Sequence, residues 1–89
     1  VVSSARDSAI GISMGAALAA ALPSLDFDCG LGTASLLRED VADARPRDGV
    51  LTAGRIVPEA EALARLAADA ERTQWWRERI TRCYRLLEG

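Results

Sequence analysis

An uncharged apolar run at residues 9–22, AIGISMGAALAAAL, constrains the fold of this chain more than any other feature. Its large side chains recur every four residues, as on one side of a helix, at Ile10, Met14, Leu18 and Leu22. A second stripe consists of small residues that let another backbone approach closely, namely Gly11, Gly15 and Ala19. The pattern predicts a helix over residues 8–22, closed by Pro23 and apolar nearly all round. Such helices are buried on several sides, which a chain of 89 residues can hardly provide.

Two missing residue types exclude several kinds of chemistry. The chain has no His, and all 11 basic residues are Arg. Histidine bases and metal ligands, a P-loop lysine and Schiff-base lysines are therefore absent from these 89 residues. The formal net charge of -2 favours neither nucleic acid nor an acidic ligand as partner. Cys29 and Cys83 stand apart, outside any CxxC, and we predict reduced cysteines in a cytoplasmic protein with no membrane-inserted segment.

The first half of the sequence predicts two strand–loop–helix units. Residues 1–3 are apolar and lead into the first helix, and residues 25–29, LDFDC, alternate apolar and acidic side chains like a short strand. A glycine loop and a short helix over residues 34–40 follow. The order indicates an α/β protein with parallel strands. Two short parallel strands do not form a stable sheet alone, so we expect the chain to be part of something larger.

The second half predicts a loop and two helices. Residues 42–49 contain the turn signals Pro46 and Asp48-Gly49, and residues 50–57 favour an extended segment. Pro58 with two following glutamates predicts a helix over residues 58–70. After a break near residues 70–73, a last helix carries an apolar stripe at Trp76, Ile80, Cys83 and Leu87.

Several short motifs have both a chemical and a purely structural interpretation. The loop CGLGTAS at residues 29–35 exposes amides that can bind an anion, but it lacks the third glycine of a dinucleotide fingerprint and equally suits a tight turn. Asp7 or Ser8 suits a helix N-cap better than a nucleophile system. Asp26 and Asp28 share a strand face, as two metal-binding carboxylates or as solvated side chains. Arginines interleaved with tryptophans in the last helix fit intrahelical stacking better than nucleic-acid binding.

Taken together, two motifs resemble a known family. Ser-Ser-x-x-Asp-Ser-x-x-Gly at residues 3–11 and Cys-Gly-Leu-Gly-Thr at residues 29–33 resemble the C-terminal part of the o-succinylbenzoate synthase family of the enolase superfamily. The segments GRIVPEAEALARLAAD and RTQWWRERITRCYRLLEG extend the resemblance over nearly the whole chain.

The resemblance implies a fold and a site. It implies an α/β fold in which residues 1–49 are the last two strand–helix units of a (β/α) barrel and residues 50–89 are an extension that packs on the barrel and an α+β capping domain. The two loops would meet at the substrate-binding mouth. There Ser3 and Ser4, with the amides of Gly30, Leu31 and Gly32, would hold a carboxylate of a small dicarboxylate substrate.

The resemblance also implies that the reaction chemistry lies elsewhere. The family is a carbon–oxygen lyase of menaquinone biosynthesis that eliminates water with two lysines and a Mg2+ ion, all on strands that would precede Val1. We therefore expect no catalytic residue, no metal ligand and no activity in the isolated 89 residues. An N-acylamino acid racemase or a muconate cycloisomerase of the same superfamily is an alternative, and a small helical interaction module is another.

Overall fold

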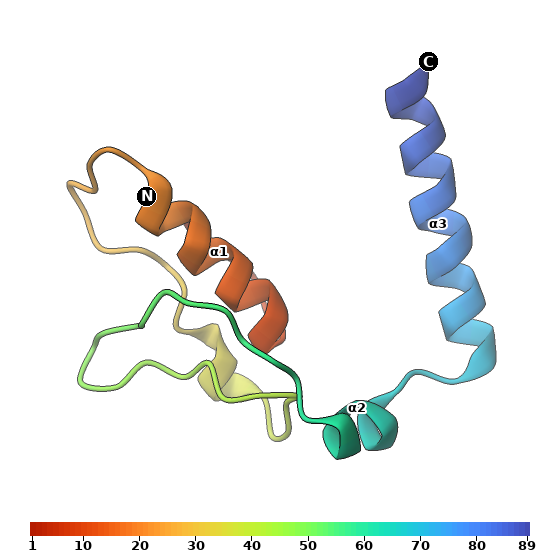
Figure 1. Ribbon diagram of the computed structural model, residues 1–89, viewed down its shortest axis with the longest axis horizontal. Coiled ribbons are helices and arrows are strands. Elements are labelled where there is room, and N and C mark those ends of the chain that lie inside the picture. Colours follow the sequence, from red (N-terminus) through yellow and green to blue (C-terminus); the bar gives the residue numbers. More distant parts are fainter.

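The computed structural model describes all 89 residues and contains helices but no β-strand (Figure 1). The order is α1 (Ala9–Ala21), a short 3-10 helix η1 (Thr33–Leu36), α2 (Ala60–Leu66) and α3 (Ala70–Glu88). The long loops between α1 and α2 fold back beneath α1, whereas α3 stands apart from the rest (Figure 1). No helix of the chain combines the length and apolarity that crossing a membrane requires.

The predicted α/β fold, with two units of a (β/α) barrel, is wrong for this chain. Residues 1–3 and 25–29 do not form strands, and the backbone pairs there only in one isolated parallel bridge between Ser3 and Gly30, just beyond the second segment. A parallel pair gains stability from neighbouring strands and from cover on both faces. Neither is present among these residues, so pairing stops after one bridge. The expected short helix at residues 34–40 is reduced to the single turn of η1.

Helix α1 packs through alanines and Ile12, and it exposes other large side chains. Its buried residues are Ala9, Ile12, Ala16 and Ala19, whereas Met14 and Leu18 are 69% and 56% exposed. Small side chains on the inner face allow the loops to lie close against the helix, and an added Cβ at Gly15 would lie 2.9 Å from Leu31 Cδ2. The large apolar stripe predicted from the sequence therefore faces solvent.

The core of the chain is small. Only eight of the 89 residues are buried, and four of them, Ala9, Ile12, Ala34 and Ala44, form one cluster with Leu51 and Ile56 against it. The accessible surface is 7318 Å², against about 5,000 Å² for a compact protein of this mass. The radius of gyration is 15.2 Å, against about 12 Å for a compact domain of this length. Much of the apolar surface is thus left uncovered.

A two-residue turn closes a small hairpin in the second loop. Asp48 and Gly49 both have positive φ, 51° and 74°, as a type I′ turn requires. The flanking Arg47 and Val50 exchange two backbone hydrogen bonds of 2.9 Å each. The turn signal in the sequence is confirmed, although the following segment forms only this one antiparallel bridge.

Candidate carboxylate-binding site

The parallel bridge brings the two serine- and glycine-containing loops together. The Ser4 N–H donates to the Gly30 carbonyl at 3.0 Å, and the Gly30 N–H donates to the Val2 carbonyl at 2.9 Å. Gly30 fits this close approach because a Cβ there would lie 2.9 Å from Ser3 Cβ. Ser3 and Gly30 are 27 positions apart in sequence, so the serines and the glycine loop come together at one edge of the molecule.

A pair of hydroxyls spans the two loops. The Ser4 Oγ lies 3.4 Å from the Thr33 Oγ1, and either hydroxyl can be the donor. Each hydroxyl keeps further donor or acceptor capacity for a ligand. Thr33 was not among the site residues expected from the sequence. The signal was its place in the Cys-Gly-Leu-Gly-Thr motif, directly after the two glycines.

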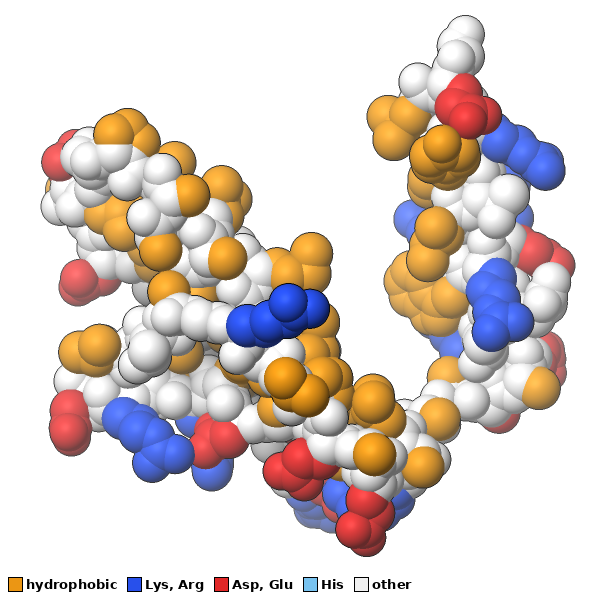
Figure 2. All heavy atoms as spheres, viewed as in Figure 1, with side chains coloured by type: hydrophobic (Ala, Val, Ile, Leu, Met, Phe, Trp, Pro, Cys, Tyr) orange, Lys and Arg blue, Asp and Glu red, His pale blue; other side chains and the backbone are white.

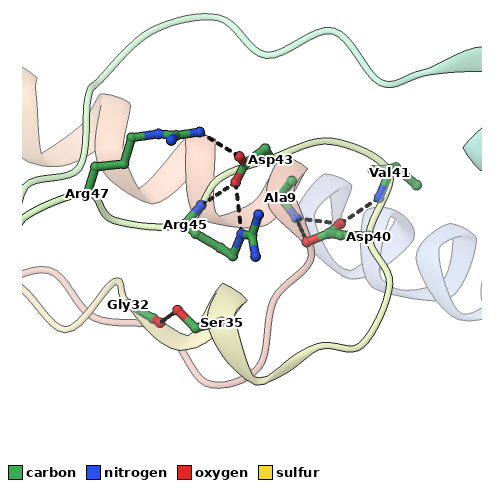
Figure 3. A network of polar contacts seen from close by, with 8 residues as sticks. All are labelled: Ala9, Gly32, Ser35, Asp40, Val41, Asp43, Arg45 and Arg47. Carbon is green, nitrogen blue, oxygen red and sulfur yellow. Dashed lines mark hydrogen bonds and ion pairs between the residues drawn. The ribbon is translucent and has the colours of Figure 1, made fainter.

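The backbone amides of the glycine loop differ in whether they are hydrogen-bonded within the chain. The Gly30 N–H is engaged by Val2, so it is not free to bind a ligand. The N–H groups of Leu31 and Gly32 donate to no other group of the chain. Leu31 is buried and Gly32 exposed, and the Gly32 carbonyl accepts the Ser35 hydroxyl at 3.2 Å (Figure 3).

Behind the site, a distant carboxylate fixes the start of α1. Ser8 occupies the N-cap position but makes no capping hydrogen bond with its side chain. Both oxygens of Asp40 instead accept the Ala9 N–H at 3.0 Å, and Asp40 Oδ1 also accepts the Val41 N–H at 2.7 Å (Figure 3). The carboxylate therefore joins the loop after η1 to the helix that follows the serines.

A second carboxylate organises the next turn of the loop. Asp43 accepts the Arg45 N–H at 3.1 Å and pairs with the Arg45 and Arg47 guanidinium groups at 3.2 and 2.9 Å (Figure 3). The hydrogen bond from the Arg45 backbone N–H, followed by the one from its side chain, lowers the pKa of the Asp43 carboxyl. The side chains of this cluster are exposed, so it shapes the loop and adds little to stability.

The arrangement suits anion binding and lacks the groups for proton transfer or metal binding. Two hydroxyls and two free amides can donate to a carboxylate. No three His, Cys, Asp or Glu side chains come together as a metal site requires, and Asp26 and Asp28 are both exposed. The Mg2+ implied by the resemblance therefore does not fit the residues present in this chain.

Comparison with known proteins identifies the relatives of the chain. It is 53% identical over 88 residues to the o-succinylbenzoate synthases of Mycobacterium tuberculosis and Mycobacterium marinum, and 52% identical to that of Mycobacterium ulcerans. Each match covers 98% of this chain but only 27% of the relative's length. No protein-family model matches the chain.

The length of the match shows how the chain is related to these proteins. The chain is homologous throughout to one segment of longer biosynthetic enzymes, and spans about a quarter of their length. Those enzymes are o-succinylbenzoate synthases, so the resemblance predicted from the serine and glycine motifs is confirmed.

Proposed function

We propose that these residues are the C-terminal portion of an o-succinylbenzoate synthase, and that they supply substrate contacts rather than reacting groups. The whole enzyme would be a carbon–oxygen lyase that converts 2-succinyl-6-hydroxy-2,4-cyclohexadiene-1-carboxylate to 2-succinylbenzoate in menaquinone biosynthesis. The observation that carries the proposal is the meeting of Ser4 with Gly30 and Thr33, inside a segment that shares 53% identity with enzymes of that name.

The part played by each group follows from its hydrogen-bonding state. The hydroxyls of Ser3 and Ser4 and the amides of Leu31 and Gly32 donate to a substrate carboxylate. Gly30 positions the two loops, because its own N–H is engaged, and Thr33 orients the Ser4 hydroxyl. The lysine acid and base, and the ligands of Mg2+, are assigned to residues outside these 89, since the chain contains neither lysine nor a metal cluster.

In this proposal the two halves of the chain have different tasks. Residues 1–49 carry the carboxylate-binding edge, and residues 50–89 form an extension that packs on the remainder of the longer protein. A cytoplasmic location stays a prediction. The isolated chain is expected to have no dehydratase activity, so detectable turnover by the purified 89 residues would contradict the assignment of the reacting groups.

The test uses a chimera in which these 89 residues replace the matching segment of the M. tuberculosis relative. Ser4→Ala removes one donor to a charged oxygen, an interaction worth about 1.5–3 kcal/mol, or about 10–150-fold in kcat/KM. Because the contact exists in both ground and transition states, we expect KM to rise and kcat to change little. Ser24→Ala, at an exposed serine outside the two loops, is the matched control. Equal kinetics for both variants would refute the role of Ser4.

A pair of glycine variants tests the geometry of the bridge. In Gly30→Ala the new Cβ would meet Ser3 Cβ, so the loops must separate and KM should rise. Gly54→Ala places the same methyl group where no atom lies within 4 Å, and should leave KM unchanged. Assays of the chimera with N-acylamino acid and muconate substrates distinguish the racemase and cycloisomerase alternatives, and turnover of either in preference to dehydration would replace the proposed reaction.

A further inference from the structure

The Asp48-Gly49 pair at the tip of the small hairpin brings together two groups that can react with each other. The side-chain carboxyl carbon of an aspartate and the backbone nitrogen of the next residue close a five-membered ring when they bond. A glycine in that next position favours the closure because it carries no side chain that obstructs the approach. Of all the aspartates in the chain, only Asp48 is followed by glycine. The sequence therefore offers one position at which this ring closes readily.

The Gly49 nitrogen is unobstructed in the structure. Both backbone hydrogen bonds of the turn join Arg47 to Val50, and the Gly49 N–H donates to no other group of the chain. No atom lies within 4 Å of the place that a Cβ on Gly49 would occupy. Asp48 and Gly49 are both exposed, in the loop between η1 and α2 at the lower left of the molecule (Figure 1), where charged side chains of both signs lie at the surface (Figure 2).

The Asp48 carboxyl is also free to turn toward that nitrogen. The guanidinium groups nearest to it in sequence, those of Arg45 and Arg47, both pair with Asp43, at 3.2 and 2.9 Å. Asp48 itself makes no hydrogen bond or ion pair with its side chain. The carboxylates of Asp40 and Asp43, by contrast, are held by backbone N–H groups. Only Asp48 thus combines an unengaged carboxyl with a following glycine.

Little resists the local opening that ring closure requires. The hairpin consists of a single antiparallel bridge, and isolated two-stranded hairpins are at best marginally stable in water. Asp48 has a φ of 51°, in the left-handed region that residues with a side chain seldom adopt. Exposed segments with few buried contacts open with free energies near zero. The native turn therefore does not keep the carboxyl carbon away from the nitrogen for long.

We propose that Asp48 is a site of spontaneous backbone isomerisation to isoaspartate. In the first step the Gly49 nitrogen bonds to the Asp48 carboxyl carbon, and the carboxyl OH leaves with the amide hydrogen as one water. In the second step one water adds to the main-chain carbonyl of the cyclic imide and breaks its bond to the Gly49 nitrogen. The chain then runs through the former side chain, and the main-chain carboxyl becomes free. Water addition to the other carbonyl restores aspartate.

The reaction needs only water, and the proposal is independent of the proposed function. Its product has one additional carbon in the backbone of a turn whose type requires two ordinary residues. The two hydrogen bonds between Arg47 and Val50 should then be lost. Leu51, the next residue, packs against the small core cluster. Isomerisation of Asp48 should therefore loosen the loop that lies beneath α1.

The test follows isoaspartate as the protein ages. The 89-residue chain, the chimera with the M. tuberculosis relative and a synthetic peptide of residues 45–52 are incubated at physiological temperature and pH. Isoaspartate is quantified by methyl transfer from an isoaspartyl methyltransferase and located by tandem mass spectrometry. We expect Asp48 in the chain and in the chimera to isomerise within about tenfold of the peptide rate, because the turn opens easily. The exposed Asp26, which precedes a bulky Phe27, is the internal control and should stay unlabelled.

Two variants keep the turn and change the reacting group. Asp48→Gly gives a Gly-Gly pair, which also favours a type I′ turn, and should abolish the label. Asp48→Asn gives Asn-Gly, the same turn with ammonia as the leaving group, and should be labelled faster. After ageing, the Val50 amide of the isomerised chain should exchange about two- to tenfold faster than that of Asp48→Gly, as expected for loss of its hydrogen bond.

Four outcomes would overturn the proposal. They are a labelled peptide beside an unlabelled chain, a labelled chain beside an unlabelled folded chimera, equal label at Asp26 and Asp48, and label that persists in Asp48→Gly. Circular dichroism shows whether the chimera is folded, and if it is not, the 89-residue chain decides. Unchanged exchange of the Val50 amide after isomerisation would refute the loosening of the loop. None of these measurements depends on dehydratase activity, so the proposed function stands or falls separately.

Discussion

Removal of the Asp40 carboxylate should loosen the start of α1, although residue 40 lies 31 positions away in sequence. In Asp40→Ala the Ala9 N–H loses both oxygens that accept it at 3.0 Å, and the Val41 N–H loses its acceptor at 2.7 Å. The Ser8 side chain makes no capping bond that would replace them. The N–H of the buried Ala9, at the start of the helix, is then left as an unsatisfied donor.

The size of the effect follows from the hydrogen bonds and the negative charge that Asp40 supplies. Loss of a helix cap costs about 0.5–2 kcal/mol, and loss of a negative charge near a helix N-terminus costs about 0.3–1 kcal/mol. The two contributions overlap, so we expect about 1–2 kcal/mol of local destabilisation, a factor of about 5–30 in the opening equilibrium. Asp40→Asn keeps one acceptor oxygen and removes the charge, so its effect should be smaller.

Amide hydrogen exchange measured by NMR is the appropriate assay, because it reports the opening of α1 separately from the rest of the chain. The amides of Ala9 and Ile12 should exchange about 5–30-fold faster in Asp40→Ala. Asp26→Ala is the matched control, since Asp26 is exposed and makes no hydrogen bond in the structure. Equal exchange rates in the two variants would show that Asp40 does not hold the helix start, and would refute the reasoning.

Three further predictions concern the loops. Gly49→Ala forces a side chain into positive φ, which costs about 1–2 kcal/mol, and should speed exchange of the adjacent hairpin amide correspondingly. The pKa of the Asp43 carboxyl, followed by carboxyl 13C NMR, should lie below its ordinary value, and Arg45→Ala should move this pKa upward. Because the folded-state pKa is lowered, any stabilisation by Asp43 is present above the unfolded-state value and is lost as pH falls through the folded-state one. Arg65→Gln breaks a half-exposed pair with Glu39 at 3.6 Å and should change the denaturation midpoint negligibly, so a large shift would contradict it.

The helices could be predicted from local sequence, with errors at their ends. The expected helix at residues 8–22 is α1 (Ala9–Ala21), and the last predicted helix is α3 (Ala70–Glu88). The helix predicted over residues 58–70 is shorter, because α2 begins at Ala60 and ends at Leu66. Its buried residue is Ala62, and Leu63 and Leu66 are exposed. Periodicity identifies a helix, but which face is buried depends on what lies beside it.

The strands could not be predicted correctly because strand formation depends on distant partners. The alternation of residues 25–29 is typical of a strand, yet Phe27 is 75% exposed and only Gly30, just beyond, is paired. A helix satisfies its own hydrogen bonds, whereas an extended segment needs a neighbour along its whole length. The chain offers one residue of pairing, and the remaining extended backbone stays irregular.

The meeting of the two loops could be predicted, although the strands beside them could not. The family resemblance implied that the serine and glycine loops would meet, and the bridge between Ser3 and Gly30 brings them together. It did not reveal that the Gly30 amide is engaged, nor that Thr33 reaches Ser4. Both facts depend on backbone register, which motif spacing does not specify. Whether the loops bind a carboxylate stays a prediction for the chimera to test.

The distribution of apolar side chains explains why the helices could be predicted from the sequence and the strands could not. Inner contacts are made by alanines together with Ile12 and Leu31, while Met14, Leu18, Phe27 and the large apolar side chains of α3 face outward. Burial of a large apolar side chain contributes about 1.5–3 kcal/mol, so a chain that exposes so many leaves most of its available stabilisation unused. Features that need only nearby residues, such as the Asp69 cap of α3 and the Asp48-Gly49 turn, are therefore complete within the chain. Features that need a second surface, such as strand pairing and the cover of α3, are incomplete, as expected of a segment that matches 27% of its relatives' length.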